Sequence, residues 1–209
     1  MLFRSVSSAK YLGVTVSSDL KFKKHISQVR GSAEASLNML KRNLRIRDTD
    51  IKTAAYTTYV RPRAEYAVCA WDPHTAGNIQ RIEMVQRKAA RWVLNKDGPQ
   101  YKRASVSHML AQLKWRSLEQ RRVDTRLTML YKIRNNLVSI SSHSLVPNTG
   151  ILHSAYPHRY VPVSKDNADQ FNSFFPRTIR QWNRLDSDVA LGKCLGTFKR
   201  HVSSVQHRS

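Results

Sequence analysis

Apolar residues recur every three or four positions over most of the chain, a pattern that predicts a mostly α-helical protein. The clearest case is an uninterrupted spacing that predicts one long amphipathic helix over residues 22–44. Its predicted buried side consists of Phe22, Ile26, Val29, Ala33, Leu37, Leu40 and Leu44. Gly31 inside this helix costs about 1 kcal/mol relative to alanine, which the buried side chains should outweigh.

Four main helices are predicted, and capping and breaking residues mark their ends. Asp48 or Thr49 can cap the second helix, and Pro62 should kink or break it. Ser117 and Gln120 form a capping box for the fourth. The approximate ranges of the four are 22–44, 49–61, 76–94 and 118–137, with shorter helices expected at 106–113, 174–182 and 195–202.

Little β structure is expected beside these helices. Residues Tyr11–Val16 suit a short strand, and the proline-punctuated residues 156–163 should be extended or irregular. The predicted fold class is therefore mostly α, a multi-helix bundle with a short N-terminal strand and a small irregular or extended C-terminal segment. The Ser-rich stretch Val138–Gly150 is the best linker candidate. The predicted division is 1–18 (strand), 19–137 (helical domain), 138–150 (linker) and 151–209 (helical and extended segment).

Charge points to the kind of partner. The 209 residues include 36 Lys and Arg against 14 Asp and Glu, a formal net charge of +22. The cations are interleaved with apolar residues from Lys21 to Arg200, so they decorate folded elements rather than one basic tail. A protein this basic is expected to bind a polyanion, and nucleic acid is the usual one.

Other compositional features narrow the compartment. The apolar runs are far shorter than the ~20 residues of a membrane span, and the N-terminus has no signal-peptide pattern. Cys69 and Cys194 do not make a disulfide framework, which favours a reducing compartment. We expect an intracellular protein of the nucleus, the cytoplasm or both, with no membrane partner and no small-molecule substrate.

Basic residues lie on the predicted outer faces of three helices. On the first helix, cations enclose small or polar residues along one strip away from the apolar side: Lys24, Gly31, Ala35, Asn38 and Arg42. Such a strip would let a phosphate backbone approach closely, and an ordinary solvated face explains it equally well. The expected nucleic-acid contacts on the three helices and the segment before them are Lys21, Lys23, Lys24, Arg30, Lys41, Arg42, Arg87, Lys88, Arg91, Arg121 and Lys132.

No self-contained catalytic, cofactor-binding or metal site is expected. The histidines and cysteines lack zinc-ligand spacing. The Asp-x-Asp pairs Asp48/Asp50 and Asp186/Asp188 precede predicted helices, where capping is the simpler explanation than a cryptic metal site. The four tryptophans, at helical spacing beside apolar residues, are expected to anchor cores rather than to stack on bases.

An ordered series of motifs from Lys10 to Val202 resembles the non-LTR (LINE-type, jockey-like) retrotransposon reverse transcriptases. The motifs are Lys10-Tyr11-Leu12-Gly13-Val14, Ser18-Asp19-Leu20 with His25-Ile26, Leu37-x-x-Leu40-x-Arg42-Asn43-Leu44, Ala55-Tyr56, Val60-Arg61-Pro62-x-x-Glu65-Tyr66-Ala67, Trp71-Asp72-Pro73, Ile82-Glu83-x-Val85-Gln86-Arg87-Lys88-Ala89-Ala90-Arg91, Arg121-Arg122 ahead of Leu130-Tyr131, and Ser173-Phe174-Phe175-Pro176-Arg177-Thr178-Ile179-Arg180-x-Trp182-Asn183.

The resemblance implies the thumb and C-terminal region of an RNA-directed DNA polymerase. In that family the thumb helices grip the template–primer duplex, and Mg²⁺ is held by palm Asp residues that have no counterpart in this sequence. The implied function is non-catalytic binding of RNA, DNA or their duplex, with a palm-containing reverse transcriptase chain as a further partner. The alternative is a decayed or domesticated retroelement relic that acts as a basic interaction module without specific nucleic-acid function.

Overall fold

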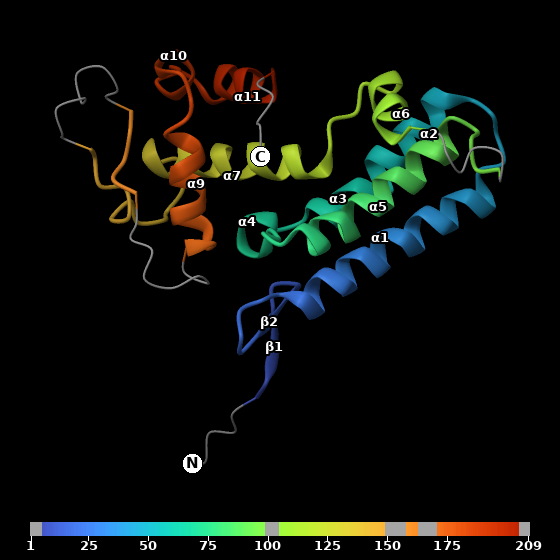
Figure 1. Ribbon diagram of the computed structural model, residues 1–209, viewed down its shortest axis with the longest axis horizontal. Coiled ribbons are helices and arrows are strands. Elements are labelled where there is room, and N and C mark those ends of the chain that lie inside the picture. The colour runs from blue at the N-terminus through green and yellow to red at the C-terminus, as the bar shows by residue number, and fades with distance from the viewer. Residues whose placement is uncertain (1–5, 99–104, 149–157, 163–170, 205–209) are drawn as a thin grey trace. The chain divides into compact units, whose positions relative to one another are not determined.

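The computed structural model describes residues 6–98, 105–148, 158–162 and 171–204 (Figure 1). The predicted mostly α fold is confirmed. The elements are β1 (Ser8–Tyr11), β2 (Val14–Ser17), α1 (Lys23–Asn43), α2 (Thr49–Ala55), the π-helix η1 (Tyr56–Val60), α3 (Arg61–Glu65), α4 (Val68–Trp71), α5 (Ala76–Val93), α6 (Val106–Gln112), α7 (Leu118–Arg134), α9 (Phe174–Trp182), α10 (Ser187–Ala190) and α11 (Leu195–Ser204).

The predicted single strand Tyr11–Val16 is instead a hairpin. β1 and β2 pair antiparallel with Tyr11 opposite Val14, and the turn between them is Leu12-Gly13. Both turn residues have positive φ, 44° and 83°, as a two-residue turn matched to the twist of the strands requires. The Tyr66 hydroxyl donates a 3.0 Å hydrogen bond to the Leu12 carbonyl, and a Cβ at Gly13 would lie only 3.2 Å from the Tyr66 ring. Gly13 therefore makes the turn possible.

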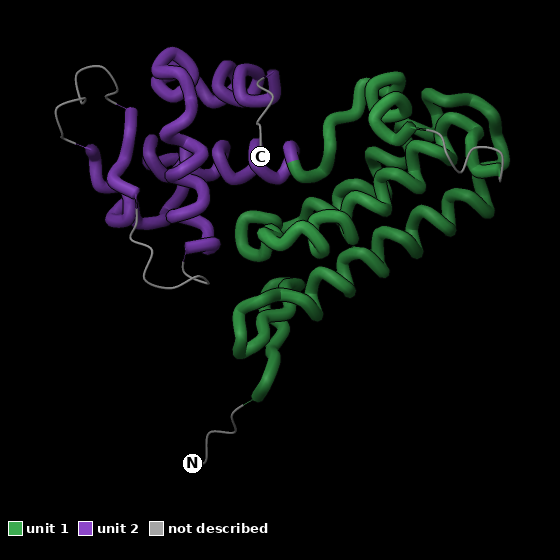
Figure 2. The backbone as a smooth tube through the Cα atoms, viewed as in Figure 1, with its two compact units in different colours: residues 1–119 green, residues 120–209 purple. Residues whose placement is uncertain are grey.

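The chain divides into two compact units, residues 1–119 and 120–209 (Figure 2). In the first unit α1 packs beside α5 (Figure 1). The predicted apolar side of α1 is its buried side, with half-buried Phe22 and Leu44 flanking its ends. The buried α1 residues are His25, Ile26, Val29, Ala33, Ser36, Leu37 and Leu40.

Pro62 changes the helix without interrupting it. α2, η1 and α3 follow one another directly from Thr49 to Glu65, and the π turn lies just ahead of Pro62. Proline has no N–H, and its ring clashes with the carbonyl four residues earlier. The wider π turn accommodates this defect. Instead of the predicted kink or break, the helix widens locally into a π turn just before Pro62.

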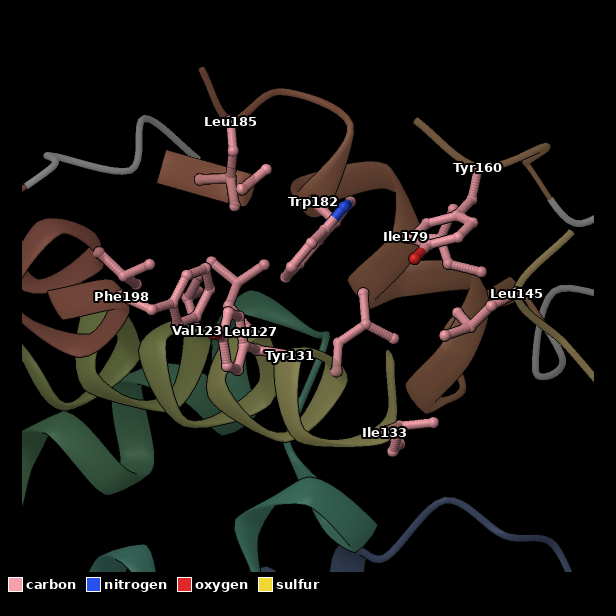
Figure 3. Close-up of a cluster of buried hydrophobic side chains, with 13 residues drawn as sticks. Val123, Leu127, Tyr131, Ile133, Leu145, Tyr160, Ile179, Trp182, Leu185 and Phe198 are labelled. Carbon is pink, nitrogen blue, oxygen red and sulfur yellow. The ribbon is translucent and has the colours of Figure 1, made fainter. Parts of the chain in front are cut away.

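The second unit has its own core around α7, α9 and α11 (Figure 3). Trp182 is fully buried, donates its indole N–H to the His158 carbonyl at 2.9 Å, and stacks on Phe198 with ring centroids 5.5 Å apart. Val123, Leu127, Leu130 and Tyr131 of α7 are buried, whereas Leu137 lies beyond the helix end and is 55% exposed.

The domain boundary differs from the predicted one. Most of α7 belongs to the second unit rather than to a helical domain ending at residue 137, because its buried side packs against the C-terminal residues. The predicted linker 138–150 is partly structured. Leu145 is buried in the same core, and Pro147 forms a β-bridge with Tyr160. Residues 149–150 of the predicted linker and residues 151–157 and 163–170 of the predicted C-terminal segment lie outside the described residues.

Candidate nucleic-acid interface

One face of α1 is open to solvent along nearly the whole helix. Its five residues, which we call the α1 strip, are all exposed: Lys24, Gly31, Ala35, Asn38 and Arg42. At 1.5 Å per residue the two cations at its ends stand about 27 Å apart along the helix axis. A Cβ at Gly31 would meet no atom within 4 Å. The small size of this residue therefore serves no packing inside the protein.

Beside the strip, three of the predicted contact residues are engaged in ion pairs. Glu34 bridges Arg30 at 3.4 Å and Lys88 of α5 at 2.7 Å, and Lys41 pairs with Asp97 at 2.8 Å. Burial opposes ionisation of Glu34, but the hydrogen bond and charge of Lys88, with Arg30, hold the pKa of its carboxyl below the usual value. The Glu34–Lys88 and Lys41–Asp97 pairs link α1 to α5 and to the segment that follows α5.

The remaining predicted contacts fall on both units. Lys21 and Lys23 are exposed at the start of α1, and Arg87 and Arg91 are half-buried on α5. Arg121 and Lys132 are half-buried on α7, of which residues 120–134 belong to the second unit, and both line a cavity there. The α1 strip in the first unit and the cavity lined by Arg121 and Lys132 in the second unit are therefore described as two candidates.

Lys52 is a buried cation that the sequence analysis did not identify. It is 4% exposed, and its Nζ donates to the Trp92 carbonyl at 3.1 Å and to Asn95 Oδ1 at 2.7 Å. Burial lowers its pKa. Lys52, Tyr56 and Val60, spaced by four, form the buried side of this helical run, whereas Ile51 is 52% exposed. The α5 C-terminus accounts for this, because a cation there interacts favourably with the last carbonyls.

Two polar residues of the Ile82–Arg91 motif have structural roles. Glu83 is buried and its Oε1 accepts the Glu119 backbone N–H at 2.7 Å, near the start of α7. Gln86 donates to the Arg116 carbonyl at 2.8 Å and accepts the Tyr56 hydroxyl at 3.2 Å. Both residues lie on the buried side of α5, at the same three-to-four spacing as its apolar residues. That spacing could have identified them from the sequence as buried positions.

The aspartate pairs and tryptophans behave largely as structural residues. Asp48 caps α2, accepting the N–H groups of Asp50 and Ile51 at 2.8 and 2.9 Å. Asp186 occupies the N-cap position of α10 without a side-chain capping bond. Three tryptophans are buried, Trp71, Trp92 and Trp182, and the half-buried Trp115 stacks on Tyr56 with centroids 4.4 Å apart. Among the described residues, no group of three or more His, Cys, Asp or Glu side chains could hold a metal ion.

Burial of His25 should make the stability of the first unit depend on pH. His25 is buried, its Nδ1 accepts the Thr15 N–H at 3.2 Å, and its ring meets Trp71 edge-on at 5.1 Å. Burial, followed by the charge of Lys10, lowers its pKa from the ordinary 6.5. The unfolded chain therefore binds this proton more readily, and we expect the free energy of unfolding to fall as pH drops below 6.5 towards the lower folded pKa. Urea titrations of the wild type and of His25→Gln should differ in this window and run parallel above it.

Gly31 offers a separate test of local stability. Because it lies exposed in the middle of α1 with open space around it, Gly31→Ala should raise the free energy of unfolding by about 0.5–1 kcal/mol. Gly31→Gln should fold equally well but hinder a partner that approaches the strip. Chemical denaturation and binding titrations of both variants check the two effects; a destabilised Gly31→Ala would contradict the open space.

The length and hydropathy of the helices bear on whether one of them could span a membrane. None of the described helices is both long enough and apolar enough to cross a membrane.

In comparisons with protein families, with curated proteins and with solved structures, none matches this chain. The geometry of the described residues therefore carries the functional argument.

Proposed function

We propose that the chain is a non-catalytic nucleic-acid-binding module that holds the phosphate backbone of a template–primer duplex or structured RNA against the α1 strip. The observation that carries this proposal is the strip itself. Its two cations flank the small residues Gly31 and Ala35 together with Asn38, and Gly31 is small without an internal reason. A phosphate backbone can approach such a helix closely.

The net charge of +22 supports a polyanionic partner. Lys24 and Arg42 offer charge, and of the three strip residues between them only Asn38 has a side chain that could hydrogen-bond a base edge. Recognition through this face should therefore follow backbone position and duplex shape rather than sequence. The resemblance of its motifs to those of non-LTR reverse transcriptases favours an RNA–DNA hybrid as the ligand, in the manner of a thumb domain.

The test is equilibrium binding of the purified chain to an RNA–DNA hybrid, to duplex DNA, to single strands and to heparin across a salt series. We expect the hybrid to bind most tightly, with log affinity falling linearly against log salt by about 0.9 for each duplex phosphate neutralised. Equal binding to all four ligands would instead favour the relic acting as a basic interaction module.

A further inference from the structure

A groove with unusual lining lies within the second unit. It occurs between α7 and α11 and has a volume of about 370 Å³. Three cations line it, Arg121 and Lys132 from α7 and Lys199 from α11. Thr128 and Ser203 line it as well. We call this site the α7–α11 groove.

The charge of the groove calls for an anion. Asp124 is the single carboxylate among its described lining residues. Within the part of the chain that the structure describes, neither Lys132 nor Lys199 takes part in an ion pair. Like charges gathered around one cavity repel each other, so a bound anion would lower the energy of the folded unit. The hydroxyl groups of Thr128 and Ser203 can donate hydrogen bonds to its oxygens.

The remaining lining argues against other ligands. Met129 is the one apolar residue among the described lining residues, and none is aromatic. Small-molecule pockets are mainly apolar, and sites that read single strands by base stacking use aromatic side chains. The groove therefore suits phosphate groups rather than bases or a drug-like molecule. Arg121 and Lys132 stand about 16 Å apart along α7, a span of several successive phosphates.

We propose that the α7–α11 groove binds the sugar–phosphate backbone of a single nucleic-acid strand, as a second contact whose residues are all separate from the α1 strip. A flexible single strand can follow a groove between two helices, whereas a rigid duplex would touch its rim. This inference rests on the proposed function, which supplies nucleic acid as the ligand. It gives the second unit a binding role of its own.

The test uses the full chain with Lys132→Gln and Lys199→Gln combined, and a 12-nucleotide uridine RNA as the probe. Arg121 is kept because it also interacts within the protein. We expect the affinity at low salt to fall about tenfold and the salt slope to lose about 1.4, since each single-strand phosphate contact contributes about 0.7. The matched control is Lys193→Gln with Arg200→Gln, two exposed cations of the same unit outside the groove, which should bind nearly as the wild type does.

A further variant is expected to strengthen RNA binding, so the test does not depend only on a loss of affinity. Ser203→Lys adds a cation to the groove and should tighten RNA binding and steepen the slope by about 0.7. The proposal is overturned if the double glutamine variant matches its control, or if it loses binding to a 12-base-pair duplex and not to the single strand. Failure of the proposed function is a different result, in which hybrid binding survives replacement of Lys24 and Arg42.

Discussion

Replacing Trp182 with alanine should destabilise the second unit by about 3–5 kcal/mol, the largest stability effect we expect from a single substitution. The indole is fully buried between α7, α9 and α11, contacts Phe198, and donates its N–H to the His158 carbonyl. Its removal leaves a cavity and takes a hydrogen-bond donor from a buried carbonyl.

Urea unfolding followed by far-ultraviolet circular dichroism measures this change, with amide hydrogen exchange in α7, α9 and α11 locating it. Leu191→Ala is the matched control, because this leucine belongs to the same unit and is 42% exposed. The control should shift stability by less than about 0.5 kcal/mol. Equal stability of the two variants would show that the second unit does not depend on the Trp182 core.

Replacing Lys24 and Arg42 together with glutamate should weaken binding to an RNA–DNA hybrid about 100-fold at low salt. Each cation lost removes about 0.9 from the salt slope on a duplex, so the slope should flatten by about 1.8. Both residues are exposed on the solvent side of α1, so circular dichroism and the unfolding midpoint should stay close to those of the wild type.

The control for this variant is Arg47→Glu with Lys114→Glu. These residues are exposed in the first unit and lie outside α1, and the net charge changes by the same amount in both variants. A nonspecific polyanion contact depends on total charge and would weaken equally in the two. Binding that falls only for Lys24 and Arg42 would locate the contact on the α1 strip.

Periodicity predicted the helices well because burial on one side of a helix repeats every three to four residues. It placed α1 within one residue at each end and correctly identified its apolar side. The prediction of a single strand at residues 11–16 was wrong. Residues of high β propensity lie on both sides of Leu12-Gly13, and the turn there depends on the conformational freedom of Gly13. A linear pattern does not show a chain reversing direction within two residues.

Tertiary packing decided the features that the sequence did not reveal. Lys52 is buried because the α5 C-terminus provides carbonyl and amide oxygens, and those oxygens come from residues forty and more positions later. The boundary between the two units differs from the predicted one because apolar residues on both sides of the Ser-rich stretch share one core. The α1 strip could be listed from the sequence, but the open space around Gly31 and the α7–α11 groove required coordinates.

The most direct test of the central claim is lysine acetylation footprinting of the full chain with and without a saturating RNA–DNA hybrid at low salt. Lys24 and Lys114 are both exposed in the first unit, so their acetylation rates in the free chain provide matched references. We expect the hybrid to protect Lys24 strongly and to leave Lys114 reacting at its free rate. Equal rates at Lys24 with and without bound hybrid would contradict a contact through the α1 strip.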